Sequence, residues 1–579
     1  MPLTNADLAA AFAQVADLLE LQDANPFRVR AYRNAARVIG ELRLDLAAHI
    51  AAGKALPRLP GIGADLAAKI HELATTGRLA LLDRLRRDLP AGITDLLGVP
   101  GLGPKRVRAL YDELQVHTLP QLLRAARDGR VRSVHGFGPK TEANIAQAIE
   151  RHLAHSRRFK LAVAAQYAAH LIAHVQRAPG VERVLAAGSL RRCRDTVGDI
   201  DLLATVNDAA AGAAVCGHFA RHAGVSEVLE LGDTRASVRL KSGLQVDLRV
   251  VPKESFGAAL MYFTGSKAHN IRLRTLALER GLKLNEYGLF KGRRALAGST
   301  EASVYAALGL AFIPPELRED RGEIEAARKG ALPALVERSH LRGDLHAHTT
   351  WSDGSASLED MARAAQGVGL QYLAISEHSR RLTMAHGLDP ARLAQQCDAI
   401  ERVNAGRCGA HLLTGIEVDI LDDGTLDLPD KALAPLDVVI AAVHSKFNLS
   451  RAQQTARILA ALDNPHVRIL AHPLGRLIDR REPYDVDMLA VVRKCRARSI
   501  ALELNAHPER LDLTDVHCRM AKDEGALVAI DSDAHSVHDF DNLAHGIGQA
   551  RRGWLEAADV LNTRPLDALL RWLRRREDA

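Results

Sequence analysis

The chain has few cysteines and no long apolar run. No uninterrupted apolar stretch approaches the roughly 20 residues that span a bilayer, and the N-terminus lacks the basic start and apolar core of a leader peptide. We therefore expect a cytoplasmic protein. The cysteines lie far apart and form no CxxC pair, so the sequence indicates neither a disulfide framework nor a cysteine zinc finger. They are Cys193, Cys216, Cys397, Cys408, Cys495 and Cys518.

The chain is long enough for several domains and is weakly basic. Single hydrophobic cores rarely grow beyond about 250 residues, so a chain of 579 residues with 47% hydrophobic content predicts at least three compact units. The net charge of +7 favours polyanionic partners in general. Spread over this length, the charge alone does not identify nucleic acid as the partner.

Three similar glycine turns lie in the first 155 residues, where amphipathic helical stretches predominate. They are "LPGIGADLAAKI", "VPGLGPKRVRAL" and "VHGFGPKTEANI". Two glycines around an apolar residue allow a tight turn that leaves backbone N–H groups outward at the start of the next helix, where the dipole favours an anion. One such turn could equally be a plain helix connection, but three in succession favour contacts to DNA phosphates. The predicted contact residues are Gly61, Gly63, Gly101, Gly103, Lys105, Gly136, Gly138 and Lys140.

A different pattern begins near residue 158. Short β-branched or alternating runs, such as "VERVLAAGSL", "GDIDLLATV" and "LQVDLRVVP", predict an α/β or α+β unit. The pair Gly188 and Ser189 is followed, after an interval of nine residues, by Asp199 and Asp201, which share one face of a strand because side chains alternate. Together with Asp247 they form three carboxylates that suit two Mg²⁺ ions and a nucleoside triphosphate. An exposed polar strand face is the alternative explanation of these aspartates.

Longer segments of this unit resemble the family X DNA polymerases typified by polymerase beta. The segments are "GSLRRCRDTVGDID", "YFTGSKAHNIRLR" and "GLKLNEYGLF", and the resemblance covers residues 1 to about 320. It implies that Asp199, Asp201 and Asp247 hold two Mg²⁺ ions and that Asp247 accepts the proton of the primer 3′-hydroxyl. It also implies a set of nucleotide and DNA contacts: Gly188, Ser189, Arg192 and Gly198 at the triphosphate, Tyr262, Phe263 and Gly265 beside the sugar, and Asn270 and Arg274 at the nascent base pair.

The N-terminal helices resemble the lyase domain of the same family, in which an amine attacks the sugar left at an abasic site. Lys69 matches the nucleophile position, and Arg28 and Tyr32 match the pocket for a 5′-phosphate. Asp65 stands where the animal enzymes carry a second lysine, and a negative neighbour keeps an amine protonated. Lys69 as a phosphate contact or a solvated helix residue is therefore an equal alternative.

Single polar residues follow apolar, strand-like runs from residue 341 onwards. This strand-then-helix repeat predicts a parallel barrel with its site at the carboxyl ends of the strands. One histidine at a strand end is usually structural, but nine ligand-type residues placed in this way indicate a multinuclear transition-metal site. They are His346, His348, Asp353, His378, Glu417, His444, His472, Asp533 and His535.

This succession closely resembles the polymerase and histidinol phosphatase (PHP) domain. The resemblance implies a distorted (β/α)7 barrel with three Mn²⁺ or Zn²⁺ ions. Family X polymerases with this domain are a bacterial type, so the expected activities are gap filling, 3′-5′ exonuclease, 3′-phosphatase and abasic-site (AP) endonuclease. The ions are assigned to three groups of residues: His346, His348, Glu417 and Asp533; Glu417, His444 and His472; and Asp353, His378 and His535.

These patterns predict a multidomain α+β chain that acts in base excision repair. The expected partners are gapped, primed or abasic DNA and dNTPs, with no membrane, and we expect a nucleoid-associated monomer. A PHP domain that is mainly a metal-stabilised scaffold, or a nucleotidyltransferase with a non-DNA substrate, are the alternatives. The expected units are a lyase-like helix-hairpin-helix domain (1–85), a helix-hairpin-helix fingers domain (86–157), a polymerase beta-like palm (158–255) and thumb (256–320), a linker (321–340) and the PHP domain (341–579).

Overall fold

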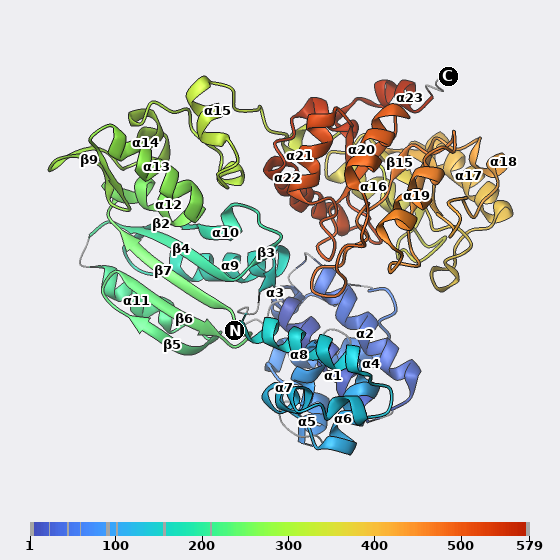
Figure 1. The fold of residues 1–579 in the computed structure, drawn as a ribbon, viewed down its shortest axis with the longest axis horizontal. Coiled ribbons are helices and arrows are strands. Elements are labelled where there is room, and N and C mark those ends of the chain that lie inside the picture. The colour runs from blue at the N-terminus through green and yellow to red at the C-terminus, as the bar shows by residue number, and fades with distance from the viewer. Residues whose placement is uncertain are drawn as a thin grey trace. The chain divides into compact units, whose positions relative to one another are not determined.

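The computed structural model describes residues 5–22, 24–42, 44, 46–57, 59–87, 93–99, 102–154, 158–208 and 211–574 (Figure 1). Internal contacts divide the chain into two units. The first contains residues 1–159, 221–228 and 238–245, and the second contains residues 160–220, 229–237 and 246–579. Within the described ranges, no helix is long and apolar enough to cross a membrane.

The described residues between 5 and 154 in the first unit are predominantly helical, as the amphipathic stretches predict. Along α4, Leu66, Ile70 and Leu73 recur at helical spacing and are all buried. Phe12 of α1 packs against Tyr32 of α2, with 5.8 Å between the ring centroids. Figure 1 shows these helices gathered into one body. They are α1 (Asn5–Leu21), α2 (Pro26–Glu41), α3 (Leu46–Ala51), α4 (Ala64–Thr76), α5 (Ala80–Arg87), α6 (Pro104–Leu114), α7 (Leu119–Arg127) and α8 (Pro139–Ala154).

A five-stranded sheet carries the predicted palm, with strand order β2-β4-β7-β6-β5. Along β4, Ile200 is buried while its neighbours Asp199 and Asp201 are exposed and half-buried, so the two aspartates share the more open face. The strands are β2 (Val181–Ala186), β4 (Asp199–Val206), β5 (Val225–Leu231), β6 (Arg235–Leu240) and β7 (Gln245–Val251), with β1 (Phe159–Lys160) and β3 (Thr196–Val197) paired separately and helices α9 (Leu161–Gln176), α10 (Gly188–Arg191) and α11 (Gly212–Ala220).

The predicted thumb has its own apolar core, which includes α15 from the segment that we expected to be a linker. Ile324 and Ala327 of α15 are buried in this core. Glu323 lies 2.6 Å from Nδ1 of the buried His269, whose other ring nitrogen lies 2.9 Å from the Tyr305 hydroxyl. Residues 321–340 are therefore partly integrated into the thumb. The elements are α12 (Phe256–Thr264), α13 (Lys267–Glu279), β8 (Lys283–Asn285), β9 (Gly288–Lys291), β10 (Arg294–Ala297), α14 (Glu301–Ala307) and α15 (Glu323–Lys329).

Seven parallel strands form a nearly closed barrel in residues 343–531, as predicted. Consecutive strands are neighbours throughout, and a parallel bridge between Ala347 and Ala534 brings the two outer strands together. Strands such as β12 are buried on both faces, as expected for a barrel wrapped by helices. The strands are β11 (Gly343–Asp344), β12 (Tyr372–Ile375), β13 (His411–Asp419), β14 (Val438–Ala442), β15 (Ile469–Leu470), β16 (Ala501–Asn505) and β17 (Val528–Asp531), and the helices are α16 (Leu358–Gly367), α17 (Pro390–Ala405), α18 (Asp430–Leu433), α19 (Arg451–Ala461), α20 (Met488–Ala497), α21 (Asp515–Glu524), α22 (Leu543–Arg552) and α23 (Leu566–Arg574).

Two candidate metal centres

Three aspartates converge at the start of β4 and on the neighbouring strand β7. Asp199, Asp201 and Asp247 each offer a carboxylate oxygen within 4.8 Å of the others. Burial, and then the charges of Asp199 and Asp247, raise the pKa of Asp201 to about 7. A divalent cation between the carboxylates would remove this repulsion, so the three residues fit the Mg²⁺ site that the sequence predicts.

The turn that precedes α10 approaches Asp201 closely. Gly188 has a positive φ of 61°, and a Cβ atom there would lie 2.2 Å from Oδ2 of Asp201. A side chain at this position would therefore collide with a carboxylate of the cluster. Ser189 follows in α10, and Gly198 directly precedes Asp199 at the start of β4.

The predicted sugar-contacting residues lie at the end of α12. Nδ2 of Asn270 donates a hydrogen bond to the carbonyl of Tyr262 at 2.6 Å. The Phe263 ring packs edge-on against that of Tyr262, with 5.3 Å between the centroids. Gly265 has a φ of 70°, and a Cβ atom there would lie 3.1 Å from Nη1 of Arg192. The predicted sugar and triphosphate residues therefore meet here, while Arg274 is exposed on α13.

The glycine turns leave the starts of their helices uncovered. Gly63 and Gly103 directly precede α4 and α6, and neither makes a side-chain capping bond. A Cβ atom at Gly63, Gly103, Gly136 or Gly138 would meet nothing within 4 Å. This open space around backbone N–H groups suits the approach of a phosphate. Of the other predicted residues, Lys105 and Lys140 are exposed, Gly61 has a φ of 64°, and Gly101 lies outside the described residues.

The residues of the predicted lyase pocket do not all reach the surface. Arg28 is exposed on α2, but Tyr32 is only 2% exposed and its hydroxyl is buried in the helical core. Lys69 forms an ion pair with Asp65 one turn away on α4. Tyr32 therefore packs against Phe12 in the core. The sequence motif alone does not distinguish this packing role from contact with a phosphate.

Glu417 of β13 lies at the centre of the histidine-rich site in the barrel. Its Oε1 lies 3.0 Å from Nε2 of His472 and 3.2 Å from Nε2 of His444, and its Oε2 lies 2.6 Å from Nδ1 of His378. Burial would raise the pKa of the Glu417 carboxyl, but His444, His378 and other neighbours hold it well below its usual range. Its two oxygens face different histidines, which is the geometry of a bridging ligand.

A second group of the barrel site contains His346, His348 and Asp533. Oδ1 of Asp533 lies 3.3 Å from Nε2 of His348 and 3.6 Å from Nε2 of His346. All three side chains are buried. Burial and the neighbouring imidazoles lower the pKa of His348 to about 3, so its ring is neutral, which is the form that binds a metal ion.

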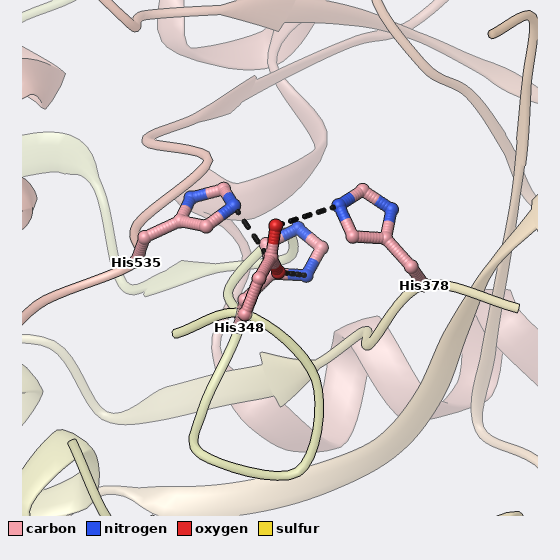
Figure 2. Close-up of side chains that lie close together, drawn as sticks. His348, His378 and His535 are labelled. Atoms are coloured by element: carbon pink, nitrogen blue, oxygen red, sulfur yellow. Dashed lines mark ion pairs between the residues drawn. The ribbon is translucent and has the colours of Figure 1, made fainter. Parts of the chain in front are cut away.

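A third group surrounds Asp353 (Figure 2). Figure 2 shows the imidazoles of His348, His378 and His535 turned toward one another, with ion pairs between them and the carboxylate. Nε2 of His378 and Nε2 of His535 each lie 3.6 Å from Asp353, and Nδ1 of His348 lies 3.9 Å from it. The predicted third group thus meets in space, and His348 joins it as well as the second group.

The donor atoms of these groups fit transition-metal ions. Among the described residues, Nε2 of His346, both ring nitrogens of His348 and Oε2 of Glu417 are buried and form no aligned hydrogen bond, although charged groups of the site lie close to them. Orphaned polar atoms at this depth are costly unless another ligand satisfies them. Imidazole and carboxylate are suitable ligands for Mn²⁺ and Zn²⁺. The arrangement differs from the predicted grouping in that His348 and His378 each join two groups: His348 also lies in the group around Asp353, and His378 also lies with Glu417 and His444.

The histidines are oriented by carboxylates that sequence reasoning missed. Nδ1 of His346 lies 2.5 Å from Glu503 of β16, and Nδ1 of His444 lies 2.5 Å from Asp419 of β13. Such contacts fix the ring tautomer and leave Nε2 for the metal. The sequence did contain a signal for Glu503: it is the single acidic residue in the apolar strand "ALELN", and a buried charge needs a partner.

Known protein families match four segments of the chain. The helix-hairpin-helix domain matches residues 3–79, and the SAM-like helix-hairpin-helix tandem matches residues 93–151. The DNA polymerase beta thumb matches residues 259–319, and the PHP domain matches residues 344–478.

Individual relatives cover either the whole chain or one half of it. The DNA polymerase/3′-5′ exonuclease PolX of Bacillus subtilis (strain 168) is 38% identical over 575 residues, which is 99% of both chains. A probable phosphatase of Thermoanaerobacter sp. (strain X514) is 29% identical over 230 residues, 38% of this chain and 89% of its own. DNA polymerase lambda of Arabidopsis thaliana is 26% identical over 300 residues, 45% of this chain and 53% of its own.

Proposed function

The chain belongs to the bacterial PolX family of DNA polymerase/3′-5′ exonucleases, and from this premise we propose that it fills short gaps in DNA during base excision repair. It is a DNA-directed DNA polymerase joined to a metal-dependent phosphoesterase of the PHP type. The convergence of Asp199, Asp201 and Asp247 is the observation that supports placing the polymerase site at these residues.

For nucleotide addition, each residue has a proposed task. Asp199, Asp201 and Asp247 would hold two Mg²⁺ ions, which supply charge neutralisation at the reacting phosphate when bound. Asp247 accepts the proton of the primer 3′-hydroxyl, and Arg192 offsets charge on the leaving pyrophosphate. The Gly188 turn approaches Asp201 so closely that a side chain would collide with its carboxylate, and this turn would hold the triphosphate beside the carboxylates.

For degradation, we propose that the nine ligand residues of the barrel hold three Mn²⁺ or Zn²⁺ ions. The ions would supply a nucleophile and stabilise the leaving oxygen when bound. The same chemistry serves a 3′-5′ exonuclease, a 3′-phosphatase and an AP endonuclease, since each breaks a phosphate ester. The presence of all nine residues, several with orphaned buried atoms, favours a working centre over a scaffold.

Binding to a gap is proposed for the helical residues 5–154. The open starts of α4 and α6 and the exposed Lys105, Lys140 and Arg28 suit phosphates on both sides of a gap. A lyase reaction at Lys69 is a weaker part of the proposal, because its amine is ion-paired with Asp65.

The test compares substrates that differ only in the strand downstream of the primer. One-nucleotide-gapped DNA with a 5′-phosphate is expected to be extended at lower protein concentration than an open primer–template of the same sequence. The same protein, given Mn²⁺, should cleave an abasic site in duplex DNA, and EDTA should abolish this cleavage. Equal use of gapped and open substrates would contradict the gap-filling proposal, and an uncut abasic site would contradict the endonuclease proposal.

A further inference from the structure

Arg192, the proposed triphosphate residue, is held by contacts on both its side chain and its backbone. Its Nε donates to Oε1 of Glu319 at 3.0 Å, and its Nη1 donates to the carbonyl of Thr264. The side chain is only 13% exposed. These contacts fix the direction of the guanidinium and leave its remaining N–H groups for a ligand.

The barrel domain contributes a second arginine to the same carboxylate. Nη1 of Arg552, the last residue of α22, donates to Oε1 of Glu319 and to the backbone carbonyl of Arg192, both at 2.8 Å. Its Nη2 donates to Oδ2 of Asp515 in α21 at 2.6 Å. With a side chain only 2% exposed, Arg552 links two barrel helices to the turn that carries Arg192.

The backbone of α22 fits closely against this turn. Gly548 lies one helical turn before Arg552, and a Cβ atom there would lie 2.9 Å from Cβ of Cys193. Cys193 follows Arg192 and has a positive φ of 53°. Any larger residue at Gly548 would push the helix away from the turn, so the contact depends on close approach of two backbones.

Positively charged side chains outnumber negatively charged ones around Glu319. Four guanidiniums, those of Arg192, Arg194, Arg552 and Arg321, contact two carboxylates, those of Glu319 and Asp515. Removal of Arg552 would leave the partly buried Glu319 to be neutralised mainly by Arg192 at 3.0 Å, because Arg194 lies 3.9 Å away and is more exposed. In a site of low dielectric, this pairing would compete with an incoming polyanion.

We propose that Arg552 of the barrel domain is a positioning residue for nucleotide addition: it shares the Glu319 carboxylate with Arg192 and thereby keeps the Arg192 charge available to the triphosphate. The inference rests on the proposed triphosphate role of Arg192. It gives the barrel domain a part in polymerisation that is independent of its metal centre.

The test is steady-state nucleotide addition by the full chain with Arg552→Gln. We expect the KM for dNTP to rise about tenfold, the size of one charge-assisted hydrogen bond, with a smaller change in kcat. Arg551→Gln is the matched control, because Arg551 precedes it on α22 but bonds to Glu316 instead. Single-strand exonuclease activity should stay native in both variants, which reports a folded barrel.

A double-mutant cycle separates charge sharing from a structural role. If Arg552 acts through Glu319, the double variant Glu319→Gln with Arg552→Gln should bind dNTP better than Arg552→Gln alone. If Arg552→Gln does not fold, Arg552→Lys keeps the charge and should retain a KM near the native value.

Each failure points to a different step. A native dNTP KM in folded Arg552→Gln, or no recovery in the double variant, overturns the inference. The inference would also be overturned if Arg552→Lys raised the KM for dNTP as much as is expected for Arg552→Gln. A native KM in Arg192→Gln would overturn the triphosphate role of Arg192 and, with it, the inference.

Discussion

At the scale of single residues, the charge of Asp201 depends strongly on its surroundings. Burial and the carboxylates of Asp199 and Asp247 all act in the same direction and raise its pKa to about 7. A carboxyl group with a raised pKa is protonated below that pH, so protons compete with Mg²⁺ for the site as the pH falls.

We therefore predict that the Mg²⁺ concentration for half-maximal nucleotide addition rises as the pH falls from 8 to 6. Below the raised pKa the increase should approach about tenfold per pH unit, because one proton must leave for the ion to bind. Initial rates measured against Mg²⁺ at pH 6, 7 and 8, at constant ionic strength, check this. The same half-maximal concentration at every pH would count against Asp201 as a ligand.

Glu417 offers a second test at a single residue. Because its two oxygens face different histidines, Glu417→Ala should lower the content of bound transition metal by two ions per chain. His535→Ala should lower it by one, since His535 joins only the group around Asp353. His378 is a poorer comparison, because it faces two groups.

Elemental analysis of the purified variants measures this difference, and circular dichroism establishes that each barrel is folded. Equal metal content in the Glu417→Ala and native proteins would refute the bridging role.

Residue patterns predict site chemistry better than they predict local packing. The nine candidate ligands of the barrel could be predicted from the sequence because eight of them follow a strand and Glu417 lies near the end of β13, and strand ends meet at one face of a barrel. Glu503 and Asp419 could not, because a supporting carboxylate has no fixed spacing from the histidine it orients. Tyr32 matches a motif, yet its ring fills the core beside Phe12. Its helical spacing from the buried Val29 and Ile39 was the local signal for burial, and the motif does not report it.

At the scale of elements, the starts of α4 and α6 follow from the glycines that precede them. Gly103 has an ordinary extended backbone, with φ of −83° and ψ of 168°, and open space around it. A valine would therefore fit without strain, in contrast to Gly61 and Gly136, whose φ values are positive. A substitution at Gly103 can therefore block access to the backbone N–H groups without straining the fold.

Gly103→Val should weaken binding to gapped DNA by roughly three- to tenfold, equally for all sequences, because phosphate contacts carry no sequence information. Affinity should fall with rising salt less steeply than for the native protein, since a phosphate contact is lost. Gel-shift titrations at several salt concentrations measure both effects. Gly367→Val, on an exposed helix end in the barrel domain, is the matched control.

A loss confined to some DNA sequences, or native binding by Gly103→Val, would contradict the phosphate-binding role of this turn.

The element α15 shows where prediction from sequence stops. Its segment "EIEAARK" is mostly charged, which favours a solvated linker, yet two apolar residues and the buried Glu323 anchor it in the thumb. The buried partner, His269, lies 54 residues earlier in the chain. A pairing over that distance depends on the tertiary fold, whereas the barrel strands are visible as local apolar runs.

At the scale of the whole molecule, two centres with separate ligands share one chain. The three aspartates belong to the five-stranded sheet, and the nine-residue centre belongs to the parallel barrel. The two centres have no ligand residue in common. Loss of one should therefore leave the chemistry of the other intact, although Arg552 couples the barrel to nucleotide binding in the way proposed above.

The most direct test assays Asp199→Ala and Glu417→Ala side by side on one labelled, one-nucleotide-gapped DNA, with and without dNTPs, in Mg²⁺ and in Mn²⁺. Glu230→Gln, an exposed carboxylate of β5, controls for loss of charge. Asp199→Ala should lose at least about a hundredfold in primer extension and still shorten the primer, while Glu417→Ala should extend it and fail to shorten it. Extension by Asp199→Ala at the native rate, or loss of both activities in either folded variant, would contradict the account of two separate centres.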